Sequence, residues 1–182
     1  MPSAFQYRCA ARIIQHQGVI AYPTESVYGL GCDPMSEIAV NRILGLKQRE
    51  LEKGLIIIAA SLGQLEPYID ISNEERKTIS EHATPITWLV RKSPLTPPWI
   101  SGRHNSIAIR VSQHPLVQRL CLQLKHPLVS TSANPAAASP ANSTLRARLY
   151  FGEQIDMYMT GVCGPLKQPT AIFDMQNNRY IR

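Results

Sequence analysis

Long apolar runs are absent from this chain of 182 residues. A helix that spans a bilayer needs roughly 20 consecutive apolar residues, and no stretch approaches that length. Residues 1–12 also lack the apolar core and cleavage site that mark a secretory signal. We therefore expect a cytoplasmic protein without a membrane span.

Cysteine and histidine are few and scattered. The four cysteines stand at 9, 32, 121 and 163, and neither they nor the five histidines show a CxxC or other metal-ligand spacing. The sequence therefore predicts no zinc centre, no redox pair and no metal held by these cysteines and histidines.

Acidic residues are fewer than basic ones, 13 Asp and Glu against 19 Lys and Arg. The net charge of +6 favours an anionic partner such as a nucleotide or RNA. A hydrophobic content of 44% allows a chain of this length to bury one core. Because no linker or internal repeat is visible, we expect a single domain over 1–182.

Apolar patterning predicts an α/β fold, with helices alternating with strands. Helical stripes are expected at 5–14, 36–46, 116–124 and 144–151, with short helices starting at capping boxes on Ser61 and Ser72. The stretch 94–102, rich in proline, is expected to be a loop. Predicted strands lie at 19–22, 55–60, 86–90, 107–111, from 128 onward, 155–159, 171–175 and 179–181.

The strand that starts at 128 ends in an unusually polar pentad, Ser-Thr-Ser-Ala-Asn at 130–134. In an extended chain Ser130 and Ser132 share a face, with Asn134 nearby and Thr131 turned toward the core. Short hydroxyl and amide groups pack poorly in a core, but they provide donors and acceptors for a polar ligand. The pentad therefore predicts one wall of a binding site.

A basic cluster, Lys47-Gln48-Arg49 with Lys53, precedes the strand expected at 55–60. On an extended loop Lys47 and Arg49 would converge on one face and could hold phosphate oxygens. Taken alone, such a cluster is more often a solvated surface loop.

A hydroxyl-rich turn follows the first strand, over 22–31. Gly29 and Gly31 begin like a dinucleotide fingerprint, but Pro34 stands at the third glycine position, which excludes a Rossmann site. A GxxxxGK[ST] loop is also absent. Glu25 in this turn fits a base, a metal ligand or a hydrogen-bonded structural carboxylate.

Arg110 interrupts the apolar run 107–111. An arginine within such a strand needs an anionic partner or an exposed face. It is therefore a further candidate for a ligand contact.

These clusters, in this order, resemble the YrdC family of threonylcarbamoyl-AMP synthases: Pro-Thr-Glu-Ser-Val-Tyr-Gly-Leu-Gly at 23–31, Lys47-x-Arg49 with Lys-Gly-Leu at 53–55, and the pentad. The resemblance covers nearly the whole chain. It implies a nucleotidyltransferase that makes threonylcarbamoyl-AMP and pyrophosphate from L-threonine, bicarbonate or CO₂, and ATP with Mg²⁺. The implied fold is an open, twisted, mixed α/β sheet with flanking helices around a basic cavity.

The same resemblance implies roles for individual residues. Lys47 and Arg49 would cancel phosphate charge during catalysis. The residues expected at ATP are Lys47, Arg49, Lys53, Ser106, Ser132 and Asn134, although Ser106 also fits an ordinary serine at a strand start. Those expected at threonine are Thr24, Arg110, Ser130 and Thr170.

The implied partners are transferase proteins that receive the adenylate and modify adenosine 37 of tRNAs reading codons that begin with A. The chain departs from the family pattern at Ile58, where many relatives have a histidine, and at 135–140, where a loop glycine is missing. Because the sequence ends at Arg182 without the added domain of longer members, it looks like the short, single-domain bacterial type.

Two other interpretations remain open from the residues. One is a non-catalytic module that binds duplex RNA or tRNA, since such RNA is recognised mainly through its phosphates and 2′-hydroxyls. The other is a carbamoyl-transfer domain of the hydrogenase-maturation type, which normally lies within a much longer chain.

Overall fold

Strands and helices alternate along residues 2–181, the part of the chain that this computed structural model describes. The strands are β1 (Ile20–Pro23), β2 (Tyr28–Gly31), β3 (Ile56–Ala59), β4 (Thr87–Arg91), β5 (Ser106–Val111), β6 (Leu128–Ser132), β7 (Met157–Tyr158), β8 (Ile172–Asp174) and β9 (Arg179–Tyr180). The α-helices are α1 (Ala4–Gln15), α2 (Glu37–Lys47), α3 (Asn73–Glu81), α4 (Pro98–Ser101), α5 (Pro115–Leu124) and α6 (Thr144–Phe151). Short 3-10 helices are η1 (Leu51–Lys53), η2 (Leu62–Gln64), η3 (Glu66–Tyr68) and η4 (Gly152–Gln154).

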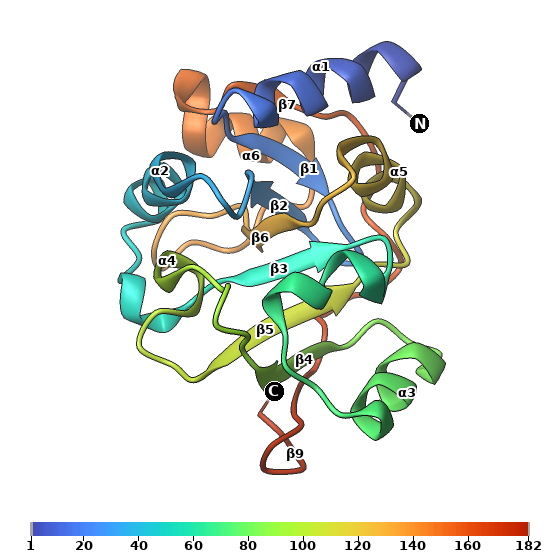
Figure 1. The fold of residues 1–182 in the computed structure, drawn as a ribbon. Helices are drawn as coiled ribbons and strands as arrows, with labels where there is room; N and C mark the ends of the chain where they lie inside the picture. The colour runs from blue at the N-terminus through green and yellow to red at the C-terminus, as the bar shows by residue number, and fades with distance from the viewer. Residues whose placement is uncertain (1, 182) are drawn as a thin grey trace.

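Across the described residues the strands form one sheet in the order β7-β1-β2-β6-β3-β5-β4-β8-β9 (Figure 1). The pairs β1–β7, β3–β5 and β4–β8 are parallel, and the remaining neighbours are antiparallel. The sheet is therefore mixed and open, with β7 and β9 at its edges. This confirms the predicted fold class.

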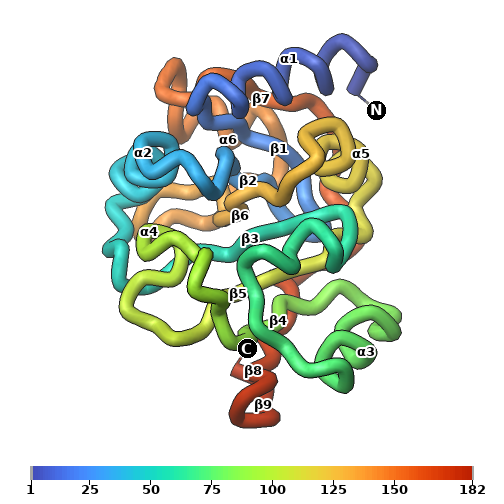
Figure 2. The backbone as a smooth tube through the Cα atoms, in the orientation of Figure 1, coloured from blue at the N-terminus to red at the C-terminus, as the bar shows by residue number. Residues whose placement is uncertain are grey.

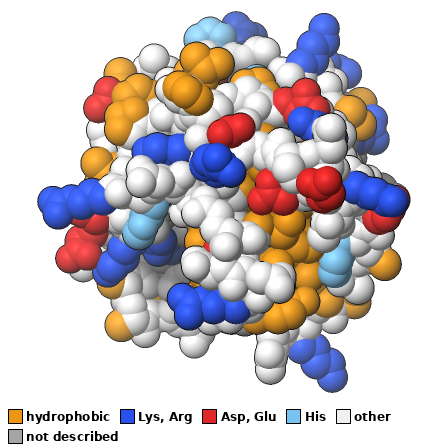
Figure 3. Space-filling view, turned by 60° about the horizontal axis from the view of Figure 1, so that its bottom comes forward, with side chains coloured by type: hydrophobic (Ala, Val, Ile, Leu, Met, Phe, Trp, Pro, Cys, Tyr) orange, Lys and Arg blue, Asp and Glu red, His pale blue; other side chains and the backbone are white. Residues whose placement is uncertain are grey.

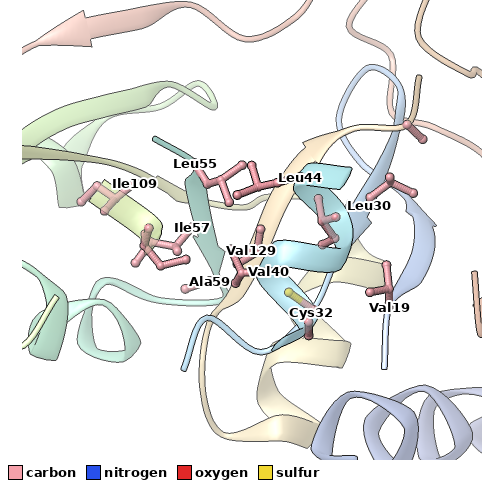
Figure 4. Packing of buried hydrophobic residues seen from close by; sticks show 14 of the residues in the cluster. Val19, Leu30, Cys32, Val40, Leu44, Leu55, Ile57, Ala59, Ile109 and Val129 are labelled. Carbon is pink, nitrogen blue, oxygen red and sulfur yellow. The ribbon is translucent and has the colours of Figure 1, made fainter. Parts of the chain in front are cut away.

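Alternate residues of the inner strands belong to two apolar clusters, which lie on opposite faces of the sheet. Ile58 and Leu128 belong to the cluster beneath α1 and α5. Their neighbours Ile57 and Val129 belong to the other cluster, to which α2 contributes Val40 and Leu44 (Figure 4). The period of two along each strand thus decides which helices cover each side chain.

The segment 159–171 connects β7, at one edge of the sheet, with β8, near the other edge (Figure 2). On its way it passes the turn between β1 and β2. There the amide of Gly164 donates to the Thr24 carbonyl oxygen at 2.9 Å, and the amide of Leu166 donates to the Glu25 carbonyl oxygen at 3.1 Å. This strap therefore joins distant parts of the sheet.

The structure confirms the predicted alternation and the capping box on Ser72. The capping box on Ser61 is wrong, since the Ser61 side chain makes no cap hydrogen bond. Gln64 Oε1 accepts from the Ala60 amide instead, and Gln64 Nε2 donates to the Cys121 carbonyl oxygen. The loop expected at 94–102 contains the single turn of α4. Strand β2 was not predicted, since two of its four residues are glycines, and it forms through antiparallel pairing with β1 and β6.

Across residues 2–181, every helix is too short or too polar to cross a bilayer.

Candidate active site

A cavity of about 570 Å³ opens on the sheet face that α1 and α5 cover only in part. On β6, Leu128 lies beneath these helices, whereas Ser130 and Ser132 on the same face line the cavity. On β3, likewise, Ile58 lies beneath the helices and Ile56 lines the cavity. The floor of the cavity is therefore the uncovered end of a face that is elsewhere apolar core.

Eight of the ten site residues expected from the sequence line this cavity. Lys47 and Asn134 are not among the lining residues. The roles of all ten stay predictions, but eight of the positions now share one space: Thr24, Arg49, Lys53, Ser106, Arg110, Ser130, Ser132 and Thr170.

One end of the cavity is built around Arg110 on β5. Its Nε and Nη2 atoms donate to Thr87 Oγ1 at 3.0 and 2.6 Å. Thr87 Oγ1 also lies 3.2 Å from Thr170 Oγ1, at the end of the strap. Arg110 Nη1 lies 3.6 Å from Glu25 Oε2. The guanidinium is thus buried, neutralised and oriented by residues from three parts of the chain.

Thr24 closes the turn between β1 and β2, because its hydroxyl donates to the Val27 carbonyl oxygen at 2.8 Å. A Cβ atom on Gly29 would lie 3.3 Å from Thr24 Cγ2 and 3.4 Å from Ser130 Oγ. A side chain at 29 would therefore require Thr24 to shift by a few tenths of an ångström for this turn to approach β6 as closely. Close packing here brings Thr24 and Ser130 to the same part of the cavity.

The opposite wall carries Arg49 and Lys53. Arg49 Nη2 donates to the Gly54 carbonyl oxygen at 2.9 Å. Its buried Nε has no hydrogen-bond partner among the described residues, and burial lowers the Arg49 pKa. Lys53 forms an exposed ion pair with Glu50 at 3.1 Å. A buried guanidinium nitrogen without an acceptor is suited to an anionic ligand.

This wall is held by close contact between two segments, 51–54 and 98–102. The amide of Leu55 donates to the Ile100 carbonyl oxygen at 2.8 Å. Gly102 has φ +59°, and a Cβ there would lie only 2.6 Å from the Glu52 carbonyl oxygen. A side chain at 102 would therefore push away the segment that carries Lys53.

Lys47 is the last residue of α2 and is buried. Its ammonium group donates to the carbonyl oxygens of Ser132 and Asn134, at 2.5 and 2.9 Å, and to Asn134 Oδ1 at 3.3 Å. Burial, followed by the charge of Arg49, lowers the Lys47 pKa to about 8. Here Lys47 fixes the pentad instead of lining the cavity.

The other end of the pentad is fixed by Asn134. Ser132 Oγ donates to Asn134 Oδ1 at 2.6 Å, and Asn134 Nδ2 donates to the carbonyl oxygens of Pro135 and Ala138. Asn134 thus holds the following loop. Thr131 is half-buried and belongs to the residues that line the cavity, and the expectation that its side chain faces the core stays a prediction.

Sequence reasoning missed Thr87 and left Glu25 unassigned. Thr87 lies within an apolar run and carries no motif; the antiparallel pairing of Trp88 with Ile109 brings it to Arg110. Ile58, where many relatives have histidine, is paired with Arg110 in register but is fully buried away from the cavity.

The charged residues lining the cavity are Arg49, Lys53 and Arg110, and no Asp or Glu among the described residues joins them. The expected basic cavity is therefore present. On the face shown in Figure 3, by contrast, Lys and Arg side chains are interspersed with Asp and Glu. Positive charge is thus concentrated inside the cavity, whereas this face of the molecule carries no continuous basic patch.

An open, mixed α/β sheet with a cavity lined by cations and hydroxyls defines a class of protein that binds anionic, polar ligands. Residues 12–182 match the family model Sua5_yciO_yrdC, described as "Telomere recombination", and the chain belongs to this family. It is 45% identical over 184 residues to the threonylcarbamoyl-AMP synthase of Pseudomonas aeruginosa, with 100% of this chain and 99% of the relative covered.

Solved structures agree with this assignment. The structure of P. abyssi Sua5 complexed with L-threonine superposes with a TM-score of 0.89 at 28% identity, covering 96% of this chain and 52% of that one. This chain therefore spans about half of P. abyssi Sua5. E. coli YciO has a TM-score of 0.84 at 25% identity, covering 96% and 86%. The predicted family is confirmed, and the RNA-binding alternative is not favoured.

Proposed function

We propose that this protein is an enzyme that condenses L-threonine, bicarbonate or CO₂, and ATP into threonylcarbamoyl-AMP, with release of pyrophosphate. One observation carries the proposal: a single cavity gathers Arg110 and Arg49 with the hydroxyls of the 130–134 pentad. The full-length likeness to a relative named threonylcarbamoyl-AMP synthase supports it. The volume of the cavity, about 570 Å³, lies within the range of small-molecule sites.

Threonine would bind at the end of the cavity that holds Arg110. The guanidinium offers charge-assisted hydrogen bonds to the substrate's carboxylate. Thr24, Ser130 and Thr170 provide hydroxyl groups around the same end. The neutral amine of the bound threonine would then add to CO₂ and release one proton to solvent, which leaves a carbamate.

The nucleotide phosphates would lie along the wall that carries Arg49 and Lys53, with Ser106 and Ser132 on the floor. A carbamate oxygen attacks the α-phosphorus, the bond to the β-phosphate oxygen breaks, and pyrophosphate leaves. Such a nucleotidyl transfer depends on alignment and on charge cancellation by cations. Since no carboxylate among the described residues lines the cavity, Mg²⁺ would enter as part of the MgATP substrate.

The product would pass to transferase proteins that modify adenosine 37 of tRNA. A direct contact with tRNA, the cytoplasmic location and the single-domain organisation over 1–182 stay predictions from the sequence.

Pyrophosphate release from MgATP tests the proposed reaction. With purified protein we expect release only when L-threonine and bicarbonate are both present, together with an AMP-linked product detected by mass spectrometry. Arg49→Ala should lower the rate at least about 100-fold, because one charged donor to a transferring phosphate commonly contributes this much. Absence of product from the wild type would contradict the proposal.

Arg103→Ala is the matched control for this experiment. Arg103 also carries a positive charge on the segment next to the cavity, but its side chain is 83% exposed and pairs with Glu52 at 3.2 Å. It does not line the cavity. This variant should retain the wild-type rate, so that a loss in Arg49→Ala is assigned to the position and not to net charge.

A further inference from the structure

Glu25 is a buried carboxylate that lies behind the cavity wall. Its residue exposure is 4%, and it is not among the residues that line the cavity. It therefore cannot be a substrate ligand in this conformation. A buried charge is retained only when partners compensate for its lost hydration, so the contacts of Glu25 indicate its role.

The two oxygens of this carboxylate have different partners. Oε1 accepts hydrogen bonds from Ser112 Oγ at 2.5 Å and from the amide of Gln113 at 3.2 Å. Oε2 has no hydrogen-bond partner among the described residues and lies 3.6 Å from Arg110 Nη1. The first oxygen fixes the carboxylate, and the second is directed at the guanidinium.

The guanidinium is thus held from two directions. Thr87 accepts from Nε and Nη2, and Glu25 attracts Nη1. Because the guanidinium is rigid and planar, two such anchors determine the plane in which it can bind a carboxylate. With Thr87 as the only anchor, the guanidinium could rotate more freely about its hydrogen bonds to Thr87.

We propose that Glu25 is a positioning residue, which sets the orientation and charge of Arg110 for the carboxylate of the amino-acid substrate. This inference rests on the proposed function, in which Arg110 binds that carboxylate. Glu25 takes no part in the bond changes at phosphorus. Its loss should therefore affect threonine recognition and leave nucleotide binding and turnover unchanged.

Glu25→Gln is the direct test, since it preserves volume and an oxygen acceptor for Ser112 but removes the charge. We expect the KM for L-threonine to rise about tenfold, while kcat and the KM for ATP stay within twofold. Glu25→Asp retains the charge and should restore part of the affinity. Glu66→Gln, which breaks a surface ion pair with Arg76, is the matched control and should leave all three parameters unchanged.

A double-mutant cycle with Arg110→Lys separates positioning from general stability. If Glu25 acts through Arg110, Glu25→Gln should add little to the KM increase caused by Arg110→Lys. The inference is overturned if the two substitutions raise the KM for threonine independently. It is also overturned if Glu25→Gln leaves the KM for threonine unchanged or lowers it, or if it raises the KM values for threonine and ATP equally. If Glu25→Gln does not fold, Glu25→Asp alone and in the Arg110→Lys background gives the same cycle.

The wild type distinguishes this inference from the proposed function. A wild-type protein that makes no threonylcarbamoyl-AMP overturns both. An active wild type whose threonine KM is insensitive to Glu25→Gln overturns only the positioning role.

Discussion

The ammonium group of Lys47 donates to the carbonyl oxygen of Ser132 at 2.5 Å, which joins the end of α2 to the end of β6 across 85 positions of sequence. Arg49, two residues further, points to the cavity instead. The left-handed Gln48 that ends α2 separates the two side chains. The Lys-x-Arg motif thus places one cation on the pentad and the other at the candidate phosphate site.

The contacts of Lys47 predict a pH dependence. Because its pKa is lowered to about 8, the cation is present below that pH and lost above it. We expect kcat/KM for ATP to fall as pH rises through about 8, approaching tenfold per pH unit. Lys47→Arg keeps a cation at higher pH and should flatten this fall, even if its overall rate is lower.

Unfolding does not explain such a loss. An unfolded chain keeps the Lys47 proton up to a pKa near 10.5, so between about 8 and 10.5 the unfolded state binds more protons than the folded state. Through this group, stability therefore rises with pH over that interval. A flat rate profile from pH 7 to 10, measured beside thermal melting, would show that the cationic form is not required.

Thr87→Val should impair both stability and threonine affinity. Valine keeps the shape of the side chain but removes the oxygen that accepts from Arg110 Nε and Nη2. Loss of these two hydrogen bonds from a charged group should cost about 1–3 kcal/mol of unfolding free energy. Thr96→Val is the control, because Thr96 donates a buried hydrogen bond to the Tyr68 carbonyl oxygen away from the cavity. Thr96→Val should lower the free energy of unfolding, measured in urea, without raising the KM for threonine.

Gly102→Ala should destabilise the protein and weaken ATP binding together. At φ +59°, with backbone oxygens of Glu52 and Leu51 at 2.6 and 2.7 Å from the added Cβ, the substitution must displace the wall that carries Lys53. We expect a loss of about 1–3 kcal/mol. Gly45→Ala, in α2 with no atom within 4 Å of the new Cβ, should instead gain about 0.5–1 kcal/mol. Similar melting temperatures for the two variants would contradict this account.

The polar face of β6 gives a further comparison. Ser132→Val removes a hydroxyl that lines the cavity and donates to Asn134 Oδ1 at 2.6 Å. Thr131 forms no side-chain hydrogen bond among those found in the described residues, and valine has its shape. Thr131→Val should therefore retain most of the pyrophosphate release, while Ser132→Val should lower it at least about tenfold. Equal losses would mean that the Thr131 hydroxyl also contacts substrate.

The sequence by itself determined the local elements and the order of the motifs. Period-two alternation placed Ser130 and Ser132 on one face of β6, and the capping box at Ser72 located the start of α3. These features depend on neighbouring residues, so a single chain segment contains the whole signal. The combination of three short motifs was specific enough to indicate the family, which the comparison with known proteins confirmed.

Only the tertiary structure decided which side chains share the cavity. That α1 and α5 cover Leu128 but leave Ser130 open depends on where two helices end above the sheet. Thr87 meets Arg110 through the register of β4 against β5. Glu25 meets Arg110 through a turn that lies 85 residues earlier in the sequence. Such contacts arise from long-range packing, and no local pattern of residue types encodes them.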